Sequence, residues 1–246
     1  MTDPPAPAPS DPPAAGTGAA QVTASRDDQV AWGISSGREH RWPASIAVVV
    51  AIALQIVLPY RVTEGLGPRW LLPALEGALL VALVVANPVR VNRESSLLRG
   101  TSIALIALIT VANVVALAEL IRALLDHASP GGRSLVYASV PIWITNVIAF
   151  GLWYWELDRG GVAARLHPTH RRPDFLFPQM STPGSAPGWT PDFLDYLYTS
   201  FTNATAFSPT DTMPLTAWSK LLMMLQSLAS LLTVAIVISR AVNILN

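Results

Sequence analysis

Five long runs of apolar residues dominate the chain after residue 40. None of them has the polar face that recurs every 3.6 residues in a surface helix. Roughly 20 apolar residues in a helix cross a bilayer core of about 30 Å, and a helix satisfies its own backbone polar groups in lipid. The pattern predicts an all-α, polytopic membrane helix bundle of about five transmembrane helices, at Ala44–Leu58, Trp70–Ala86, Gly100–Leu125, Leu135–Trp155 and Ala217–Leu245.

A shorter amphipathic segment precedes the last run. Thr190, Pro191 and Asp192 are typical of a helix start, because a hydroxyl caps the first turn, proline fits it and an acid is favoured there. From Asp192 to about Thr202 the apolar side chains share one face, and the polar run Asn203–Asp211 follows. A helix too short to span, a polar stretch and a long helix follow one another as in a re-entrant loop. We therefore predict a re-entrant half-helix before the last span.

Regions outside the runs divide the chain and orient it. Six prolines among the first thirteen residues predict a disordered tail, because such a segment buries too little apolar surface to offset its ordering entropy. Ten arginines fall on the side of the tail and of the second and fourth loops, and five on the other side, which favours a cytoplasmic N-terminus. We expect a disordered Pro/Ala-rich cytoplasmic tail at 1–40, a four-helix transmembrane region at 41–155, a basic Pro-rich cytoplasmic loop at 156–189, and the half-helix, Thr-rich segment and last transmembrane helix at 190–246.

Composition excludes several function classes. Hydrophobic residues make up 51% of the chain and charged residues 13%, whereas a soluble domain carries about 25% charged residues. Equal numbers of acidic and basic residues, 16 each, leave no field that would draw nucleic acid. The chain has no cysteine, and His167 and His170 have no third ligand nearby beyond Asp174. We expect no catalytic site, no cofactor and no metal.

Two carboxylates inside the runs are candidates for function. Glu76 and Glu119 lie about six residues from the same ends of adjacent predicted helices, which places them at a similar depth. Buried ionisable groups in lipid are costly, and the pair could share a cation or a proton. Alternatively, Glu119 pairs with Arg122 one turn on, and Glu76 reaches the interface or accepts a hydrogen bond.

Uncharged polar residues also recur inside the runs. Asn113 and Asn146 lie near the middle of adjacent antiparallel helices, where we expect hydrogen bonds between helices or, alternatively, a polar pore lining. Gln226, Ser230 and Thr233 follow one face of the last run. They are candidates for lining a water path, or for holding the helices together.

The half-helix region resembles the pore module of two-helix potassium channels. Thr205 and Asp211 match the two ends of that family's Thr-Val-Gly-Tyr-Gly-Asp filter, with one residue too many between them. The stretch has no glycine to turn successive carbonyls toward an ion, so potassium selectivity is not implied. The filter-like candidates are Thr205, Ala206, Phe207, Ser208, Thr210 and Asp211.

A second resemblance covers residues 150–246. The chain is similar to bacterial, largely actinobacterial, integral membrane proteins of unknown function. This likeness implies a family and no activity. It rests on Tyr154–Gly161, Pro173–Met180, Phe193–Tyr198, Asn203–Thr216, Lys220–Ser227 and Arg240–Leu245.

Together these observations predict a multi-pass protein of the bacterial inner membrane that acts as a channel-like conduit for a small cation. One such loop cannot enclose a pore, so we expect a homo-oligomer in the lipid bilayer. The alternative is a non-transporting membrane scaffold or partner subunit, whose tail and basic loop recruit a protein or anionic lipid. A third reading is a membrane enzyme that uses Glu156, Asp158, His167 or His170 at the cytoplasmic face.

Overall fold

The computed structural model describes residues 40–58, 68, 70–86, 96–125, 132–165, 172–182, 189–205 and 211–245. Within these ranges the chain is mostly helical. The predicted tail at 1–39 and residues 206–210 lie outside the described residues. In chain order the elements are α2 (Trp42–Val57), α4 (Leu71–Ala86), α5 (Ser96–Leu125), α6 (Gly132–Leu157), η2 (Asp158–Gly160), α7 (Val162–Arg165), β1 (Phe175–Leu176), α8 (Pro178–Ser181), α9 (Phe193–Thr205), β2 (Met213–Pro214) and α10 (Ala217–Leu245).

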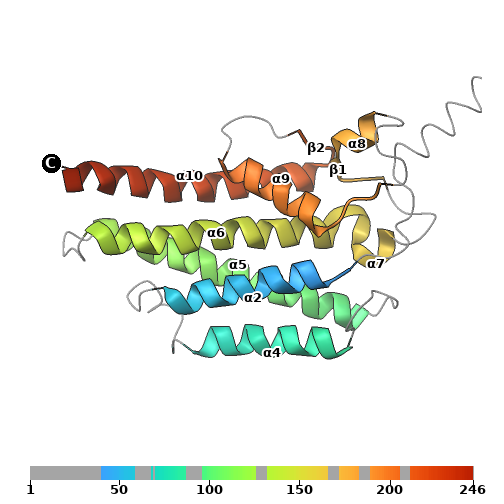
Figure 1. Cartoon of the computed structure of the whole chain (residues 1–246), viewed down its shortest axis with the longest axis horizontal. Helices are drawn as coiled ribbons and strands as arrows, with labels where there is room; N and C mark the ends of the chain where they lie inside the picture. Colours follow the sequence, from blue (N-terminus) through green and yellow to red (C-terminus); the bar gives the residue numbers. More distant parts are fainter. Residues whose placement is uncertain are drawn as a thin grey trace, which may run out of the picture.

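Each of the five predicted apolar runs forms a helix, with bounds within a few residues of those expected. The helices α2, α4, α5, α6 and α10 lie side by side, and successive ones run in opposite directions (Figure 1). As a result, the end of α6, the start of α10 and the start of α2 lie at the same end of the bundle, which we call the α7 end (Figure 1).

Within the described residues, two helices are long and apolar enough to cross a membrane, judged by length and composition. They are Leu97–Leu125 within α5 and Ala217–Ser239 within α10. The apolar helices α2 and α4 have 16 residues each, fewer than the roughly 20 that span a bilayer core. The helical class is therefore confirmed, whereas the number of five membrane crossings stays a prediction.

Helix α6 lies at the centre of the bundle and contacts α2, α5, α9 and α10. Almost every described side chain between Ala138 and Glu156 is buried or half-buried. Helix α2 contacts both α6 and α4, and small residues, Ala44, Ala47 and Ala51, recur on its buried face at the spacing of one helix face. Small side chains allow helix backbones to approach closely.

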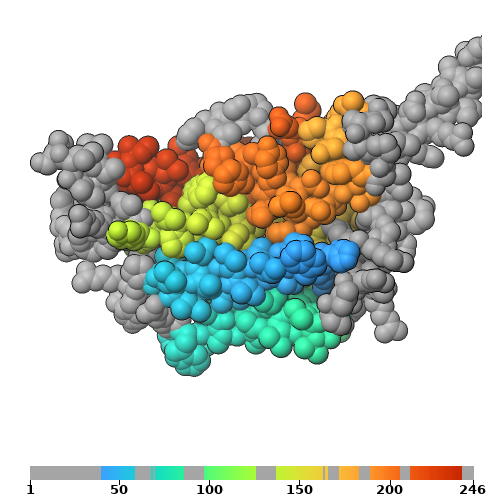
Figure 2. All heavy atoms as spheres, in the orientation of Figure 1, coloured from blue at the N-terminus to red at the C-terminus, as the bar shows by residue number. Residues whose placement is uncertain are grey.

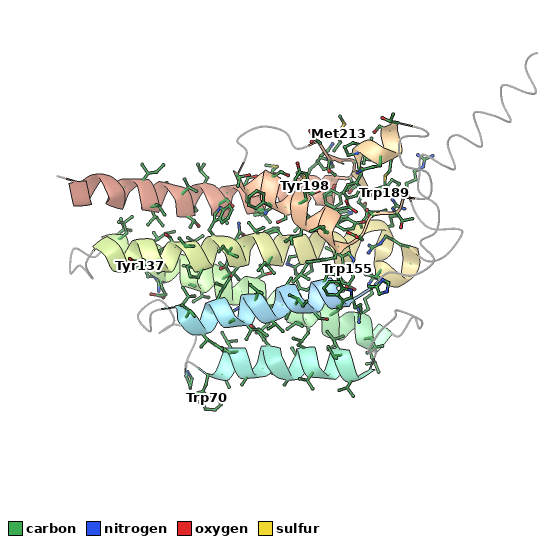
Figure 3. The ribbon with its side chains drawn as sticks, viewed as in Figure 1. Trp70, Tyr137, Trp155, Trp189, Tyr198 and Met213 are labelled. Atoms are coloured by element: carbon green, nitrogen blue, oxygen red, sulfur yellow. The ribbon has the colours of Figure 1, made fainter. Side chains whose placement is uncertain are left out.

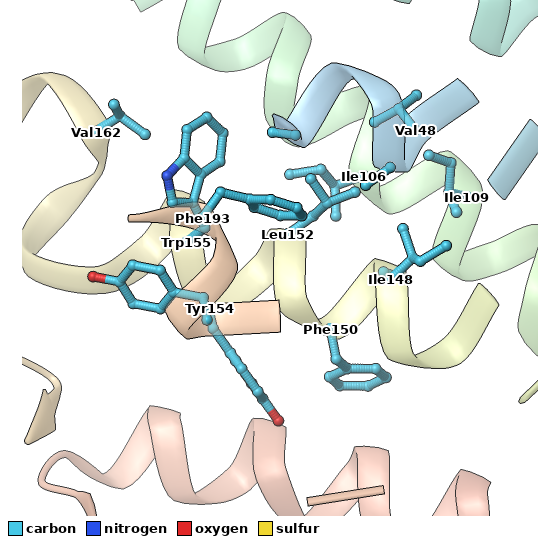
Figure 4. Packing of buried hydrophobic residues seen from close by; sticks show 14 of the residues in the cluster. Val48, Ile106, Ile109, Ile148, Phe150, Leu152, Tyr154, Trp155, Val162 and Phe193 are labelled. Carbon is cyan, nitrogen blue, oxygen red and sulfur yellow. The ribbon is translucent and has the colours of Figure 1, made fainter. Parts of the chain in front are cut away.

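Helix α9 lies on the outside of this core, across α6 and beside α10 (Figure 2). Gly151 of α6 makes this close contact feasible: a Cβ atom at Gly151 would stand 3.2 Å from the Cα of Leu197. At the start of α9, the ring of Phe193 packs edge-on against Trp155 at a centroid distance of 5.8 Å (Figure 4). The first turn of α9 is thereby fixed to the last turns of α6.

Helix α9 differs from its prediction at both ends. It begins at Phe193, and its N-cap is Asp192 rather than Thr190, since the Asp192 carboxylate accepts the N–H groups of Leu194 and Asp195. It continues to Thr205, three residues past the expected end. A contact with another helix accompanies the extension: the Asn203 side chain donates a hydrogen bond to the Met223 carbonyl of α10.

The predicted loop at 156–189 is partly folded. It contains η2, α7, β1 and α8 at the α7 end of the bundle (Figure 1). Strand β1 pairs antiparallel with β2, with Phe175 opposite Pro214 and Leu176 opposite Met213. Strands of two residues have no hydrophobic period, and for that reason the sequence pattern indicated only a loop.

Candidate functional site

A network of buried polar side chains joins α6, α9 and α10. Its centre is Gln226 of α10, whose side chain is fully buried. The Gln226 Oε1 accepts hydrogen bonds from the Tyr154 hydroxyl at 2.6 Å and from Asn203 Nδ2 at 2.8 Å. The Gln226 Nε2 donates to the carbonyl and the hydroxyl of Ser200, at 2.8 and 2.6 Å. One side chain of α10 therefore holds residues of both neighbouring helices.

Further hydrogen bonds extend the network along the same helices. Asn146 of α6 donates to the Ser230 hydroxyl at 2.9 Å, and Ser200 donates to the Val147 carbonyl at 2.6 Å. Ser227 donates to Asn203 Oδ1 at 3.2 Å. Thr233 is buried, and its hydroxyl bonds to the Ala229 carbonyl of its own helix. The three residues predicted to follow one face of α10 thus all face the protein interior.

This network can fasten helices without water. Leaving a buried donor or acceptor unpaired costs about 1–3 kcal/mol. A network whose amide donors and acceptors are paired therefore stabilises this packing of the helices over packings that would break the hydrogen bonds. The Oε1 and Nε2 atoms of the Gln226 side-chain amide each make two hydrogen bonds to protein. These hydrogen bonds fix the position of α9 along α6 and α10.

A second polar cluster lies at the α7 end, around two aspartates. Asp158 Oδ1 accepts the backbone N–H of Asp174 at 2.8 Å, and Asp174 Oδ2 accepts the backbone N–H of Arg159 at 2.8 Å. Asp158 Oδ2 accepts the Tyr196 hydroxyl of α9 at 2.6 Å. Arg159, 2% exposed, forms an ion pair with Asp158 at 3.4 Å that lacks hydrogen-bond geometry. Trp218 of α10 donates to Asp174 Oδ1 at 2.9 Å.

The aspartate cluster ties together four segments that are far apart in the sequence: the end of α6, strand β1, helix α9 and the start of α10. Arg159 adopts a positive φ of 56°, followed by Gly160 at 89° and Gly161 at 109°. Glycine favours this left-handed backbone, which turns the chain sharply after α6. The sequence suggested chemical roles for Asp158 and Asp174, as a candidate enzyme residue and a possible metal ligand, and did not predict that they lie together. The available signal was the Asp-Arg-Gly-Gly order directly after an apolar run.

The segment that contains α9 begins and ends at the same end of the bundle. Helix α9 starts beside Trp155 near the end of α6, and β2 pairs with β1 at that end as well. On the way back, the Thr212 hydroxyl lies 3.2 Å from that of Thr199, in the middle of α9. Thr212, which precedes β2, therefore lies beside α9.

Of the filter-like candidates, the structure describes Thr205 and Asp211. Thr205 is exposed in the last turn of α9, and its hydroxyl donates to the Phe201 carbonyl of the same helix at 2.9 Å. Thr205, which we expected in the polar run after the half-helix, is therefore part of the helix. Asp211 is exposed. Ala206, Phe207, Ser208 and Thr210 lie outside the described residues.

The two carboxylates of the apolar runs have separate partners. Glu76 is fully buried and accepts a hydrogen bond from Gln55 of α2 at 3.2 Å, while its Oε2 atom has no hydrogen-bond partner. Glu119 forms an ion pair with Arg122 at 2.7 Å. These are the contacts expected if Glu119 pairs with Arg122 and Glu76 accepts a hydrogen bond, rather than if the two carboxylates share a cation or a proton. Asn113 is buried on α5.

Among the described residues there is no group of three histidines, aspartates or glutamates that could hold a metal ion. His167 and His170 lie outside those residues. Among the described residues, hydrogen bonds join the helices, whereas the ion pairs Arg122–Glu119 and Arg159–Asp158 each lie within one segment.

Comparisons with known proteins add no relative to this description. No family model, no curated protein and no solved structure matches the chain.

Proposed function

We propose that the chain is an inner-membrane protein with five transmembrane helices, α2, α4, α5, α6 and α10. Large apolar side chains are exposed on the flanks of the bundle, among them Val81, Val111 and Leu228, at 55–61%. Such a surface is unfavourable in water and matches lipid. Interfacial aromatic residues lie near both ends, with Trp70 and Tyr137 at one end and Trp189 at the other (Figure 3).

The basic residues support one orientation in the membrane. Arg41, Arg99, Arg165 and Arg172 all belong to segments at the α7 end. Arginines close to helix ends stay on the cytoplasmic side. We therefore take the α7 end as cytoplasmic, and the opposite end, which carries Arg122, as periplasmic.

In this frame α9 is a re-entrant half-helix. The observation that carries the proposal is that the chain enters α9 and returns through β2 at the same end of the bundle. With 13 residues, α9 is about 20 Å long, too short for a core of about 30 Å. Its buried hydrogen bonds to α6 and α10 supply the protein surroundings that a half-helix at membrane depth requires.

The function that we propose for this half-helix is a conduit for a small cation between copies of the chain. Leu194, Tyr198 and Phe201 are exposed along one side of α9, at 66, 55 and 47%, and would face a neighbouring copy in a homo-oligomer. Thr205 and Asp211 are exposed at the deep end of α9 and on the return. The C-terminal end of a helix is electronegative and favours cations.

A non-transporting scaffold is the second candidate, and one observation favours it. Gln226, Asn146 and Ser230 are buried and bonded to protein, as side chains that only fasten helices would be. In that reading α9 is a structural wedge, and ion passage is absent.

Liposome flux of the purified protein tests the conduit. We expect passage of a small monovalent cation, and a decrease of about tenfold in Asp211→Asn and in Thr205→Ala, the effect of about 1.4 kcal/mol on a barrier. The matched control is Thr202→Ala, because Thr202 also lies on α9 and also bonds to its own helix at 2.9 Å.

The control variant should conduct like the unmodified protein. An absence of flux for every monovalent cation would reject the conduit and leave the scaffold. Equal losses in Thr202→Ala and Thr205→Ala would show that the helix, not the filter-like residue, determines the flux.

A further inference from the structure

An open pocket of about 580 Å³ lies at the α7 end, between the start of α5, the end of α6 and the start of α10. It does not include the polar network around Gln226. Its walls combine two arginines, two tryptophans and exposed leucines: Arg99, Arg172, Trp153, Trp218, Leu221 and Leu225.

The pocket changes from charged to apolar along the bundle. Arg99 is near the start of α5, and Arg172 precedes β1; both are exposed. Leu221 and Leu225 are one and two turns into α10, at 59 and 57% exposure. With the α7 end in the cytoplasm, the arginines lie at headgroup level and the leucines at the level of the acyl chains.

The aromatic walls are held in place by hydrogen bonds. The indole N–H of Trp153 donates to the Thr110 hydroxyl at 2.9 Å, and that of Trp218 donates to Asp174 Oδ1 at 2.9 Å. The other oxygen of Asp174 accepts the backbone N–H of Arg159. The one acid in the lining therefore has both oxygens hydrogen-bonded, and it faces an excess of positive charge.

Gly161 lies directly behind Arg99. A Cβ atom at Gly161 would be 3.4 Å from Arg99 Nε and 3.1 Å from the Glu156 carbonyl. The glycine turn after α6 thus leaves room for the guanidinium group at the mouth of the pocket. The position of Arg99 follows from the same backbone turn that builds the aspartate cluster.

We propose that this pocket binds one anionic phospholipid of the cytoplasmic leaflet. The phosphate group is placed at Arg99 and Arg172, the glycerol region between the two tryptophans, and an acyl chain along Leu221 and Leu225. Basic pockets between transmembrane helices on the cytoplasmic side suit such headgroups by charge. The inference rests on the proposed membrane position and orientation, and it is independent of ion conduction.

Native mass spectrometry tests this site. The full-length protein is released from nanodiscs that contain equal amounts of phosphatidylglycerol and phosphatidylcholine, and the retained lipids are counted. We expect retained phosphatidylglycerol to exceed phosphatidylcholine, and the excess to fall about fivefold for each arginine replaced in Arg99→Gln and Arg172→Gln. Arg122→Gln is the matched control, because Arg122 is an exposed arginine at the other end of α5.

A second variant keeps the charges and fills the apolar half. Leu225→Trp should lower the retention of both lipids without changing their ratio. Equal retention of the two lipids by the unmodified protein, an equal loss in Arg122→Gln, or full retention in Leu225→Trp would each overturn the proposal. So would displacement of the lipid by millimolar glycerol phosphate, which would identify a site for a soluble phosphate.

Failure of the membrane proposal is detected separately. Carbonate extraction of cell membranes reports whether the protein is embedded, whatever lipid it prefers. A protein that stays in the pellet but shows no lipid preference would reject the lipid site alone.

Discussion

At the scale of the residue, Gln226 illustrates how one amide positions a half-helix. Its four hydrogen bonds reach Tyr154 on α6 and Ser200 and Asn203 on α9. An amide can do this because it carries two donors and an acceptor with two lone pairs. Replacement by an apolar group of similar size removes all four bonds and leaves the partners buried.

We expect Gln226→Leu to lower the free energy of unfolding by about 2 kcal/mol or more, since more than one buried polar group loses its partner. The measurement is thermal or denaturant unfolding of the protein in detergent. Thr233→Val serves for comparison, because the Thr233 hydroxyl is buried but bonds only within α10. A loss no larger in Gln226→Leu than in Thr233→Val would contradict the fastening role.

The sequence identified Gln226, Ser230 and Asn146 as polar positions inside apolar runs, but not their partners. Partner choice depends on how α9 is rotated against α6, and a short amphipathic pattern does not specify that rotation. The same holds for Asp158, whose contact with Tyr196 joins residues 38 positions apart. Spacing along one helix predicts a shared face, whereas contacts between helices require the fold.

At the scale of the element, α9 docks where α6 has a glycine. Leu197 packs over Gly151, with its Cα and Cδ1 atoms each 3.2 Å from the position of a Cβ. A larger side chain at Gly151 would therefore push α9 away from α6 and strain the hydrogen bonds of the network.

Gly151→Val should destabilise the protein by about 1–3 kcal/mol, the cost of overpacking a core, and should increase amide hydrogen exchange in α9. Gly77→Val is the matched control, because Gly77 is also a helical glycine and nothing stands within 4 Å of its Cβ position. Both substitutions carry the same helix-propensity change, so their difference measures the overlap. Equal effects of the two variants would show that the contact with Leu197 has no energetic role.

The apolar runs predicted the long helices closely, because a run of 16 or more apolar residues is too long for a typical strand and favours a buried or membrane-spanning helix. The ends of α9 were less accurate. Its N-cap is Asp192 rather than Thr190 because Asp192 and Asp195 cap each other reciprocally. The Asp195 carboxylate accepts the backbone N–H of Asp192, and the Asp192 carboxylate accepts those of Leu194 and Asp195. Its end lies at Thr205, and a contact of Asn203 with α10 accompanies the extension.

In the whole molecule, both ends of the half-helix region lie at one end of the helix bundle. Helix α6 fills the centre and contacts α2, α5, α9 and α10, while α4 packs on α2 and α5. The aspartate cluster ties both ends of the half-helix region to the α7 end. If the bundle is embedded as we propose, residues 190 and 211 are then on the same side of the membrane.

Cysteine labelling tests this claim directly, because the native chain contains no cysteine. Single variants Thr190→Cys and Asp211→Cys are treated with a membrane-impermeant maleimide in right-side-out and inside-out vesicles, with the exposed Tyr137→Cys as a marker of the opposite end. We predict that positions 190 and 211 react only in inside-out vesicles and position 137 only in right-side-out vesicles. Reaction of 190 and 211 from opposite sides would mean that the segment crosses the membrane completely, and would contradict the half-helix.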